Sequence, residues 1–332
     1  MNTGLKITAF ATAVAATFGT AYGVGKAVDP VTDKKATAAP HEEHGETGRT
    51  SAAGDTAAGD GEAAGSDPGG LRISEGGYTL DLRTARVDAG REEELRFAVV
   101  DDATGRNVTA YEKEHTEELH LIVASRDLTT YRHLHPERAA DGTWSTRVDL
   151  PEAGGHRVFA DFRPRGEKEA LTLGADLAVA GKSAPRELPA RSAKATVDGY
   201  DVTLKGALKP GEARDLTLSV ERNGRPVTDL QPYLGAYGHL VALRSGDLAY
   251  LHVHPNGEPG DGTTKPGPGV SFTTTAPSAG TYRLFLDFQH GGEVRTAAFT
   301  VRAGGPAGDG AAKENTEEST EDSTEEGGGH GH

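Results

Sequence analysis

Residues 119–136 read LHLIVASRDLTTYRHLHP, and residues 238–255 read GHLVALRSGDLAYLHVHP. The three histidines of the first stretch recur 119 residues later, so that positions 120, 133 and 135 correspond to 239, 252 and 254. A Phe-x-Asp-Phe sequence follows each stretch, at residues 159–162 and 285–288. A fixed interval of this length indicates that the chain holds two copies of one domain.

Both copies consist of short runs rich in Val, Leu, Phe and Thr, separated by Gly, Pro and Asp, which is the pattern of successive β-strands. In the first copy we expect strands at 78–87, 94–101, 119–125, 131–136, 143–150, 156–163 and 171–180. In the second copy we expect them at 200–208, 214–222, 239–244, 249–254, 270–275, 281–289 and 295–302. The sequence therefore predicts an all-β fold of two tandem immunoglobulin-like β-sandwich domains.

Composition predicts where these domains begin and end. The two sandwiches span residues 71–181 and 195–303, and a proline-containing linker, 182–194, joins them. Two further segments have few large apolar residues, and we expect them to be a disordered linker and a disordered acidic tail: 29–70 and 304–332. Residues 1–28 contain an uncharged stretch, 7–25, flanked by lysines, which predicts a signal or transmembrane anchor helix.

Whole-chain composition excludes several classes of protein. The chain contains no cysteine, so it has neither disulfides nor thiolate metal sites. Its formal net charge of −15 argues against nucleic acid as a partner. Signatures of hydrolases, phosphate-binding loops and helical zinc proteases are missing from the sequence, so we expect a protein that is not an enzyme.

The repeated histidines are the candidate functional residues. Side chains two positions apart on a strand point to the same face, and the earlier histidine opens a strand that a hairpin can pair beside them. A proline ends each His-x-His strand, which favours a site at the rim of each sandwich. The aspartate of each Phe-x-Asp-Phe strand can add an oxygen if that strand reaches the same rim. The candidate metal ligands are His120, His133, His135 and Asp161 in the first copy, and His239, His252, His254 and Asp287 in the second.

Nitrogen and oxygen ligands without a thiolate suit Cu(II), Zn(II) or Ni(II), and the general order of metal affinities puts copper first. The same histidines also fit a structural role, in hydrogen bonds to turns or in packing beside aromatic rings. His115 and His290 have no histidine counterpart in the other copy, so the sequence assigns them no role.

A tyrosine supports the sandwich interpretation. Ala279-Gly280-Thr281-Tyr282-Arg283 matches the turn into a late sandwich strand, where the phenol bonds back to the backbone. The first copy has His156 at this position, for which we expect a structural role.

The chain resembles a group of exported bacterial proteins with tandem immunoglobulin-like repeats. Their repeats read His-Leu-x-Val-x-Ser-x-Asp-Leu, His-x-His-Pro and Phe-x-Asp-Phe, which correspond here to residues 120–128, 133–136 and 159–162. The second copy departs from the first element by one additional residue before Asp247. The resemblance covers residues 72–303 and implies an association with copper and heavy-metal handling.

Two hypotheses follow from the sequence. The first is a non-catalytic metal-binding protein that buffers or delivers copper, fixed in the cell membrane by a single N-terminal helix with its domains outside the cytoplasm, or secreted if that helix is cleaved. The alternative is a cell-surface scaffold or adhesion module that binds another protein and whose histidines are structural.

Overall fold

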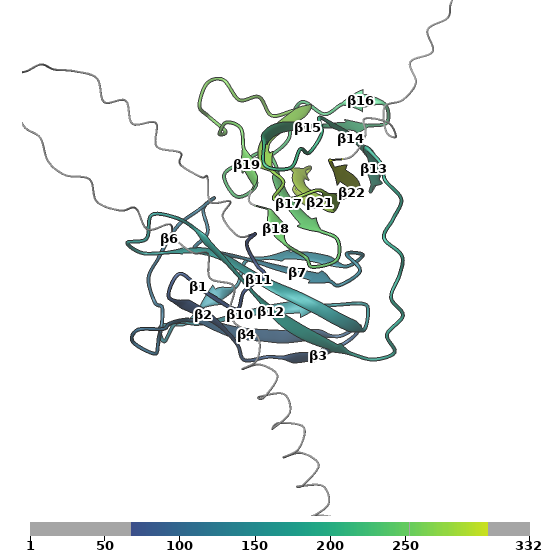
Figure 1. Cartoon of the computed structure of the whole chain (residues 1–332). Coiled ribbons are helices and arrows are strands. Elements are labelled where there is room, and N and C mark those ends of the chain that lie inside the picture. The colour runs from purple at the N-terminus through teal and green to yellow at the C-terminus, as the bar shows by residue number, and fades with distance from the viewer. Residues whose placement is uncertain (1–67, 252, 305–332) are drawn as a thin grey trace, which may run out of the picture. The chain divides into compact units, whose positions relative to one another are not determined.

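The computed structural model describes residues 68–251 and 253–304, and these residues form an all-β structure with four principal sheets (Figure 1). The predicted fold class, two tandem immunoglobulin-like β-sandwiches, is confirmed for this part of the chain. The predicted anchor helix and the acidic tail lie outside the described residues. Within those residues, no helix has the length and apolar character needed to cross a membrane.

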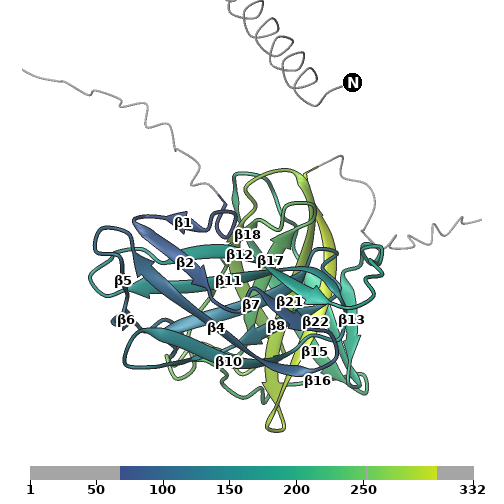
Figure 2. The same ribbon diagram turned by 90° about the horizontal axis from the view of Figure 1, so that it is seen from below.

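The first repeat has two facing sheets. One has the order β1 (Ser74–Glu75), β2 (Tyr78–Leu82), β4 (Glu92–Asp101), β10 (Thr143–Asp149) and β9 (Glu137–Arg138), with β5 (Arg106–Asn107) beside β4. The other has the order β3 (Arg86–Asp88), β12 (Leu171–Ala180), β11 (Gly154–Pro164), β7 (Leu119–Ser125) and β8 (Tyr131–Leu134), with β6 (Tyr111–Glu112) paired to β11. Figure 2 shows β2, β4 and β10 side by side in the first of these sheets.

The second repeat has the same plan. One sheet has the order β13 (Lys194–Val197), β14 (Tyr200–Lys205), β15 (Ala213–Arg222), β20 (Gly269–Thr275) and β19 (Val253–Pro255), with β16 (Arg225–Pro226) beside β15. The other has the order β18 (Tyr250–Leu251), β17 (His239–Arg244), β21 (Gly280–His290) and β22 (Glu293–Ala303).

Most predicted strands are confirmed to within two residues, but two are not continuous. The run 78–87 divides into β2 and β3, which belong to different sheets. The run 249–254 divides into β18, which pairs with β17, and β19, which pairs with β20 in the facing sheet. The sequence predicts one continuous His-x-His strand beside β17, and this prediction is wrong for the second copy, because β19 pairs with β20 instead.

Strand β7 is buried on both faces, and all seven of its residues have little exposed surface. Leu121 and Val123 point into the core of the first repeat, together with Trp144. Ile122 and Ala124, on the opposite face, belong to a separate apolar cluster that contains residues of the second repeat. A strand buried on both sides needs apolar residues at nearly every position, which explains the sequence of this strand.

This second apolar cluster is an interface between the two repeats. It joins β7, β8 and β11 of the first repeat to β17, β18 and β21 of the second, through Ile122, Ala124, Leu128, Tyr131, Phe159, Val241, Leu243, Leu248, Tyr250 and Phe285. Tyr131 stacks on Phe285 with ring centres 4.1 Å apart, and the equivalent pair, Tyr250 and Phe159, has ring centres 5.7 Å apart. The tyrosine of each repeat thus packs against the phenylalanine of the other repeat, which is the reciprocal pattern of contacts found in a symmetric dimer.

Candidate metal centre

Three histidines of the first repeat meet at this interface. His120 lies on β7, His133 lies on β8, and His135 follows β8 directly. The two strands pair with Ile122 opposite His133, so that His120 and His133 project from the same face of the sheet. One candidate ligand atom from each of the three histidines lies within 4.8 Å of the other two. The convergence that the sequence predicted for this copy is therefore present.

The spacing of the three rings suits coordination of one ion. Their centres are 5.3 Å apart for His120 and His133, 5.3 Å for His120 and His135, and 5.0 Å for His133 and His135. A metal–nitrogen distance of about 2.1 Å puts an imidazole centre roughly 3.2 Å from the ion, and tetrahedral angles then separate two such centres by about 5 Å. The observed separations match this value.

Hydrogen bonds fix which ring nitrogens carry protons. His120 donates from Nε2 to the carbonyl oxygen of Glu114 over 3.0 Å, because a carbonyl oxygen can only accept. His133 donates from Nδ1 to Oδ2 of Asp287 over 2.9 Å. In neutral rings, Nδ1 of His120 and Nε2 of His133 then both carry lone pairs, and these two atoms are 3.1 Å apart. Metal-bound histidines commonly donate a hydrogen bond from the ring nitrogen that does not bind the metal.

The third histidine has a buried nitrogen without a partner. Nε2 of His135 is inaccessible to solvent and makes no hydrogen bond with the described residues. Buried polar atoms nearly always have partners, so such an atom calls for an explanation. A shared ion would satisfy this nitrogen together with the two lone pairs of His120 and His133.

Burial keeps the rings of His120 and His135 neutral. Desolvation, helped by the nearby His133, lowers the pKa of His120 to about 4. Desolvation, with smaller contributions from His133 and His120, lowers the pKa of His135 to about 3. Neutral imidazole is the form that binds a metal, so these two rings can bind a cation at neutral pH.

Each of the two candidate aspartates makes at least one contact across the repeat boundary. Asp287 accepts hydrogen bonds from His133, from the hydroxyl of Tyr131 at 3.2 Å and from Oγ1 of Thr296 at 2.5 Å. It lies opposite His239 in the β17–β21 register, but its side chain bonds to His133 of the first repeat.

Asp161 occupies the equivalent position in the first repeat. It accepts from the hydroxyl of Tyr250 at 3.2 Å and from Oγ1 of Thr172 at 3.3 Å. No hydrogen bond joins it to the three histidines among the described residues. The arrangement thus differs from the expected one rim site in each copy, because the interface brings the two repeats into a common cluster.

Of the described histidines of the second copy, His239 lies near the three histidines of the first copy, whereas His254 lies on a strand of the facing sheet. The ring centre of His239 lies 6.2 Å from that of His120 and 6.2 Å from that of His133. His252 lies outside the described residues. The backbone of His254 pairs with Thr273 on β20, in the sheet that faces β17.

His115 is a neighbour of the centre that the sequence did not single out. Its ring centre lies 5.1 Å from that of His239 and 6.2 Å from that of His120. It occupies the tight turn 114–117, where His115 and Thr116 have φ of 50° and 73°. The corresponding turn, 233–236, lies at the same 119-residue interval, so the repeat period could have located it.

Two other sequence predictions concern structural residues. Tyr282 donates from its hydroxyl to the carbonyl oxygen of Ser278 at 2.8 Å, which is the bond expected at this turn. His156 is 1% exposed and donates from Nδ1 to the carbonyl oxygen of Gly154 at 3.3 Å, in agreement with a structural role.

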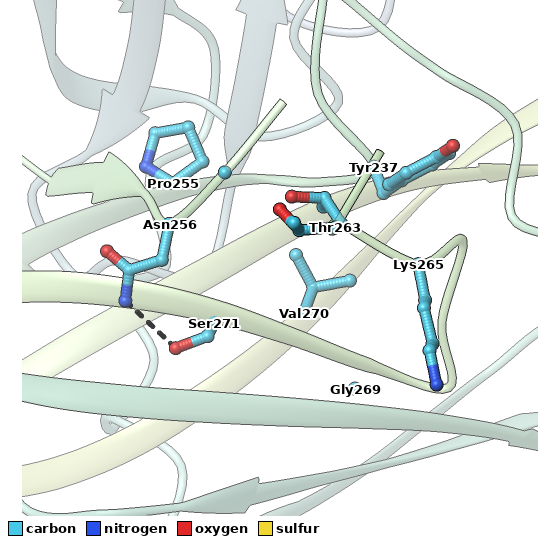
Figure 3. Close-up of a pocket in the computed structure, with 10 residues that line it drawn as sticks. Tyr237, Pro255, Asn256, Thr263, Lys265, Gly269, Val270 and Ser271 are labelled. Atoms are coloured by element: carbon cyan, nitrogen blue, oxygen red, sulfur yellow. Dashed lines mark hydrogen bonds between the residues drawn. The ribbon is translucent and has the colours of Figure 1, made fainter. Parts of the chain in front are cut away.

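A pocket of about 230 Å³ lies elsewhere in the second repeat, lined in part by Tyr237, Asn256, Lys265 and Ser271 (Figure 3). The neighbouring Asp261 accepts hydrogen bonds from the backbone and hydroxyl groups of Thr263 and Thr264. These bonds close the loop on itself, and the pocket has no contact with the histidines of the centre.

Comparisons with solved structures give weak similarities. The D0–D1 domains of intimin match at 10% identity over 68% of this chain and 96% of that chain, with a TM-score of 0.20. A protein from Corynebacterium diphtheriae described as a "Putative membrane anchored protein" matches at 10% identity over 70% of this chain and 60% of that chain, with a TM-score of 0.21. InvD of Yersinia pseudotuberculosis matches at 13% identity over 70% of this chain and 58% of that chain, with a TM-score of 0.23. The last two matches span less than two thirds of those chains, and TM-scores this low carry no argument about function.

No curated protein matches the chain. One family model does, and it is described as "Domain of unknown function (DUF8832)". It matches twice, over residues 73–178 and 195–305, which together make up more than half of the sequence. The description does not mention a metal, so the association with copper remains a prediction. The chain belongs to the DUF8832 family and carries two copies of its domain in tandem.

Proposed function

We propose that this protein binds one divalent transition-metal ion through His120, His133 and His135, and that it buffers or delivers this ion without catalysing a reaction. The main support is the 3.1 Å contact between Nδ1 of His120 and Nε2 of His133. The other nitrogen of each ring already donates a hydrogen bond, so two acceptors face each other. Two facing lone pairs repel each other unless a cation lies between them.

A shared proton is the competing explanation for this contact. It would require one of these two buried rings to carry a positive charge. A proton between His120 and His133 would also leave Nε2 of His135 without a partner. A metal ion accounts for all three nitrogens at once, and this favours metal binding over a purely structural cluster.

The ligand set narrows the choice of metal. Three neutral imidazoles without a thiolate suit Cu(II), Zn(II) or Ni(II), and copper binds such sites most tightly.

The proposed location is outside the cytoplasm, at the cell membrane. It rests on the uncharged stretch 7–25 near the start of the chain. Cleavage of this stretch would release the protein instead. The tandem sandwiches are compatible with both outcomes.

A metal titration tests the proposal. We would use the full chain with the histidines of the terminal segments replaced by asparagine (His41, His44, His330 and His332), because these residues can bind metal loosely. We expect uptake of Cu(II) or Zn(II) at micromolar concentration. The double variant His133→Asn with His135→Asn should lose this uptake, whereas His290→Asn should keep it, because His290 bonds to Tyr200 and Asp229 instead.

Absence of uptake, or equal uptake by the double variant, would refute the metal proposal. The alternative function would then remain, in which the protein is a surface scaffold or adhesion module for another protein. In that case the histidines would only stabilise the interface between the repeats.

A further inference from the structure

His239 lies in the second repeat, close to the three histidines of the first. It is 7% exposed, and its ring centre lies 6.2 Å from those of both His120 and His133. Its Nε2 donates to the carbonyl oxygen of Tyr233 at 2.9 Å, with Leu234 as a second acceptor at 3.2 Å. The other nitrogen, Nδ1, therefore carries the lone pair in a neutral ring, and the described residues offer it no hydrogen bond.

This arrangement repeats that of His120. The acceptor of His120 is Glu114, in the turn 114–117, and the acceptor of His239 is Tyr233, in the turn 233–236. Both turns hold their two central residues at positive φ, which points a carbonyl oxygen back at the histidine that opens the next strand. His239 is therefore held in the same tautomer as a residue that we assign as a ligand.

The three histidines of the first repeat leave room for another ligand. A tetrahedral ion bound by three imidazoles keeps one open position, and a fourth imidazole would have its centre about 5 Å from the others. The ring centre of His239 is 6.2 Å from those of His120 and His133, and a small rotation of a side chain can close the difference from the roughly 5 Å expected of a ligand. His115 is a weaker candidate, because it is exposed and water can satisfy its nitrogens.

We propose that His239 is the fourth ligand of the ion held by His120, His133 and His135, so that the metal joins the two repeats. This inference rests on the proposed function and extends it. The ion would add a coordinate bond to an interface that already contains the Tyr131–Asp287 and Tyr250–Asp161 hydrogen bonds. Neither repeat alone would then hold the ion with the affinity of the whole chain.

The test uses Cu(II) with the full chain in which the four histidines of the terminal segments are replaced. Titration gives the stoichiometry and the affinity, and electron paramagnetic resonance counts the nitrogens bound to copper. The variants are His239→Ala and His239→Gln, in which the glutamine amide can still donate to the carbonyl oxygen of Tyr233. The controls are His115→Asn and His290→Asn, and Trp144 fluorescence in the presence of a chelator verifies that each variant is folded.

We expect one ion for each chain, with one nitrogen fewer and an affinity at least about tenfold lower in both His239 variants. Both control variants should match the parent chain. The inference is wrong if the folded His239→Gln chain keeps the parent affinity and nitrogen count, although the proposed function would stand. It is also wrong if the parent chain binds two ions and His239→Gln removes one, since His239 would then belong to a separate site. If the parent chain binds no ion, the proposed function itself fails.

Discussion

His133 of the first repeat donates its Nδ1 proton to Asp287 of the second repeat over 2.9 Å, and both side chains are almost completely buried. This bond fixes the tautomer of His133 and leaves Nε2 free to face His120. The carboxylate that orients a candidate ligand therefore comes from the other copy of the domain. The two repeats contribute to one centre, and duplication of the domain supplied both parts.

Removal of this carboxylate should weaken metal binding. In Asp287→Ala, His133 loses the acceptor that orients it, and loss of such a partner typically costs 10- to 100-fold in affinity. The matched control is Asp161→Ala, which removes the equivalent bond to Tyr250. We expect both variants to lose about 1–3 kcal/mol of stability, and only Asp287→Ala to lose metal affinity by calorimetric titration. Equal losses of affinity in the two variants would contradict a specific role for Asp287.

The interface between the repeats should couple their unfolding. Phe285 stacks on Tyr131 across the boundary, and Phe285→Ala should cost about 3–5 kcal/mol. Trp144, the single tryptophan of the chain, lies in the core of the first repeat and reports on its unfolding. We expect Phe285→Ala, a change in the second repeat, to lower the midpoint of the Trp144 fluorescence transition in urea. An unchanged Trp144 midpoint would mean that the repeats unfold independently.

The buried imidazoles should make the metal-free protein sensitive to mild acid. Burial lowers the pKa of His120 to about 4, and that of His135 and His239 to about 3, from the ordinary value of 6.5. Below pH 6.5 these histidines bind protons in the unfolded chain but not in the folded chain. The free energy of unfolding therefore falls as the pH decreases. The slope is about 1.4 kcal/mol per pH unit for each ring that stays neutral, and less for a partly exposed ring.

This prediction is measured by urea unfolding between pH 7 and pH 5 in the presence of a chelator. The window separates the histidines from carboxylates such as Asp127, whose pKa hydrogen bonds lower to about 2. His239→Gln should show a shallower slope than the parent chain. A free energy of unfolding that stays constant over this window would contradict the burial of neutral rings.

The tyrosine at the turn into β21 makes a small and separable contribution. Tyr282→Phe removes the hydrogen bond to Ser278 and should cost about 1 kcal/mol in the free energy of unfolding, with no effect on metal uptake. Denaturant unfolding and metal titration of the same sample check both parts. A change in metal affinity in this variant would mean that this turn is energetically coupled to the metal centre.

The strands were predictable from the sequence because local residue patterns determine them. The runs 119–125, 171–180 and 239–244 have the predicted bounds, since turn residues delimit each of them. The break between β18 and β19 was not predictable, because a strand that changes sheets keeps its apolar character throughout. The first copy's histidine cluster followed from strand period and hairpin pairing, both of which are local.

The contribution of the second repeat to the centre depends on how the two sandwiches pack, and this is a long-range property. One signal was present in the sequence. The β7 sequence LHLIVAS lacks the alternation of a strand with one face in solvent, which indicates burial on both faces. Nothing local distinguishes Asp287, which orients His133, from Asp161, which bonds to Tyr250. Only the packing of the two repeats assigns their different partners.

The most direct test is a crystal structure of the chain grown with Cu(II) or Zn(II), with anomalous diffraction measured at the absorption edge of the metal. We expect one strong anomalous peak about 2.1 Å from Nδ1 of His120, Nε2 of His133 and Nε2 of His135. The absence of a peak among these nitrogens at saturating metal, with the rings joined only by hydrogen bonds, would contradict the metal proposal.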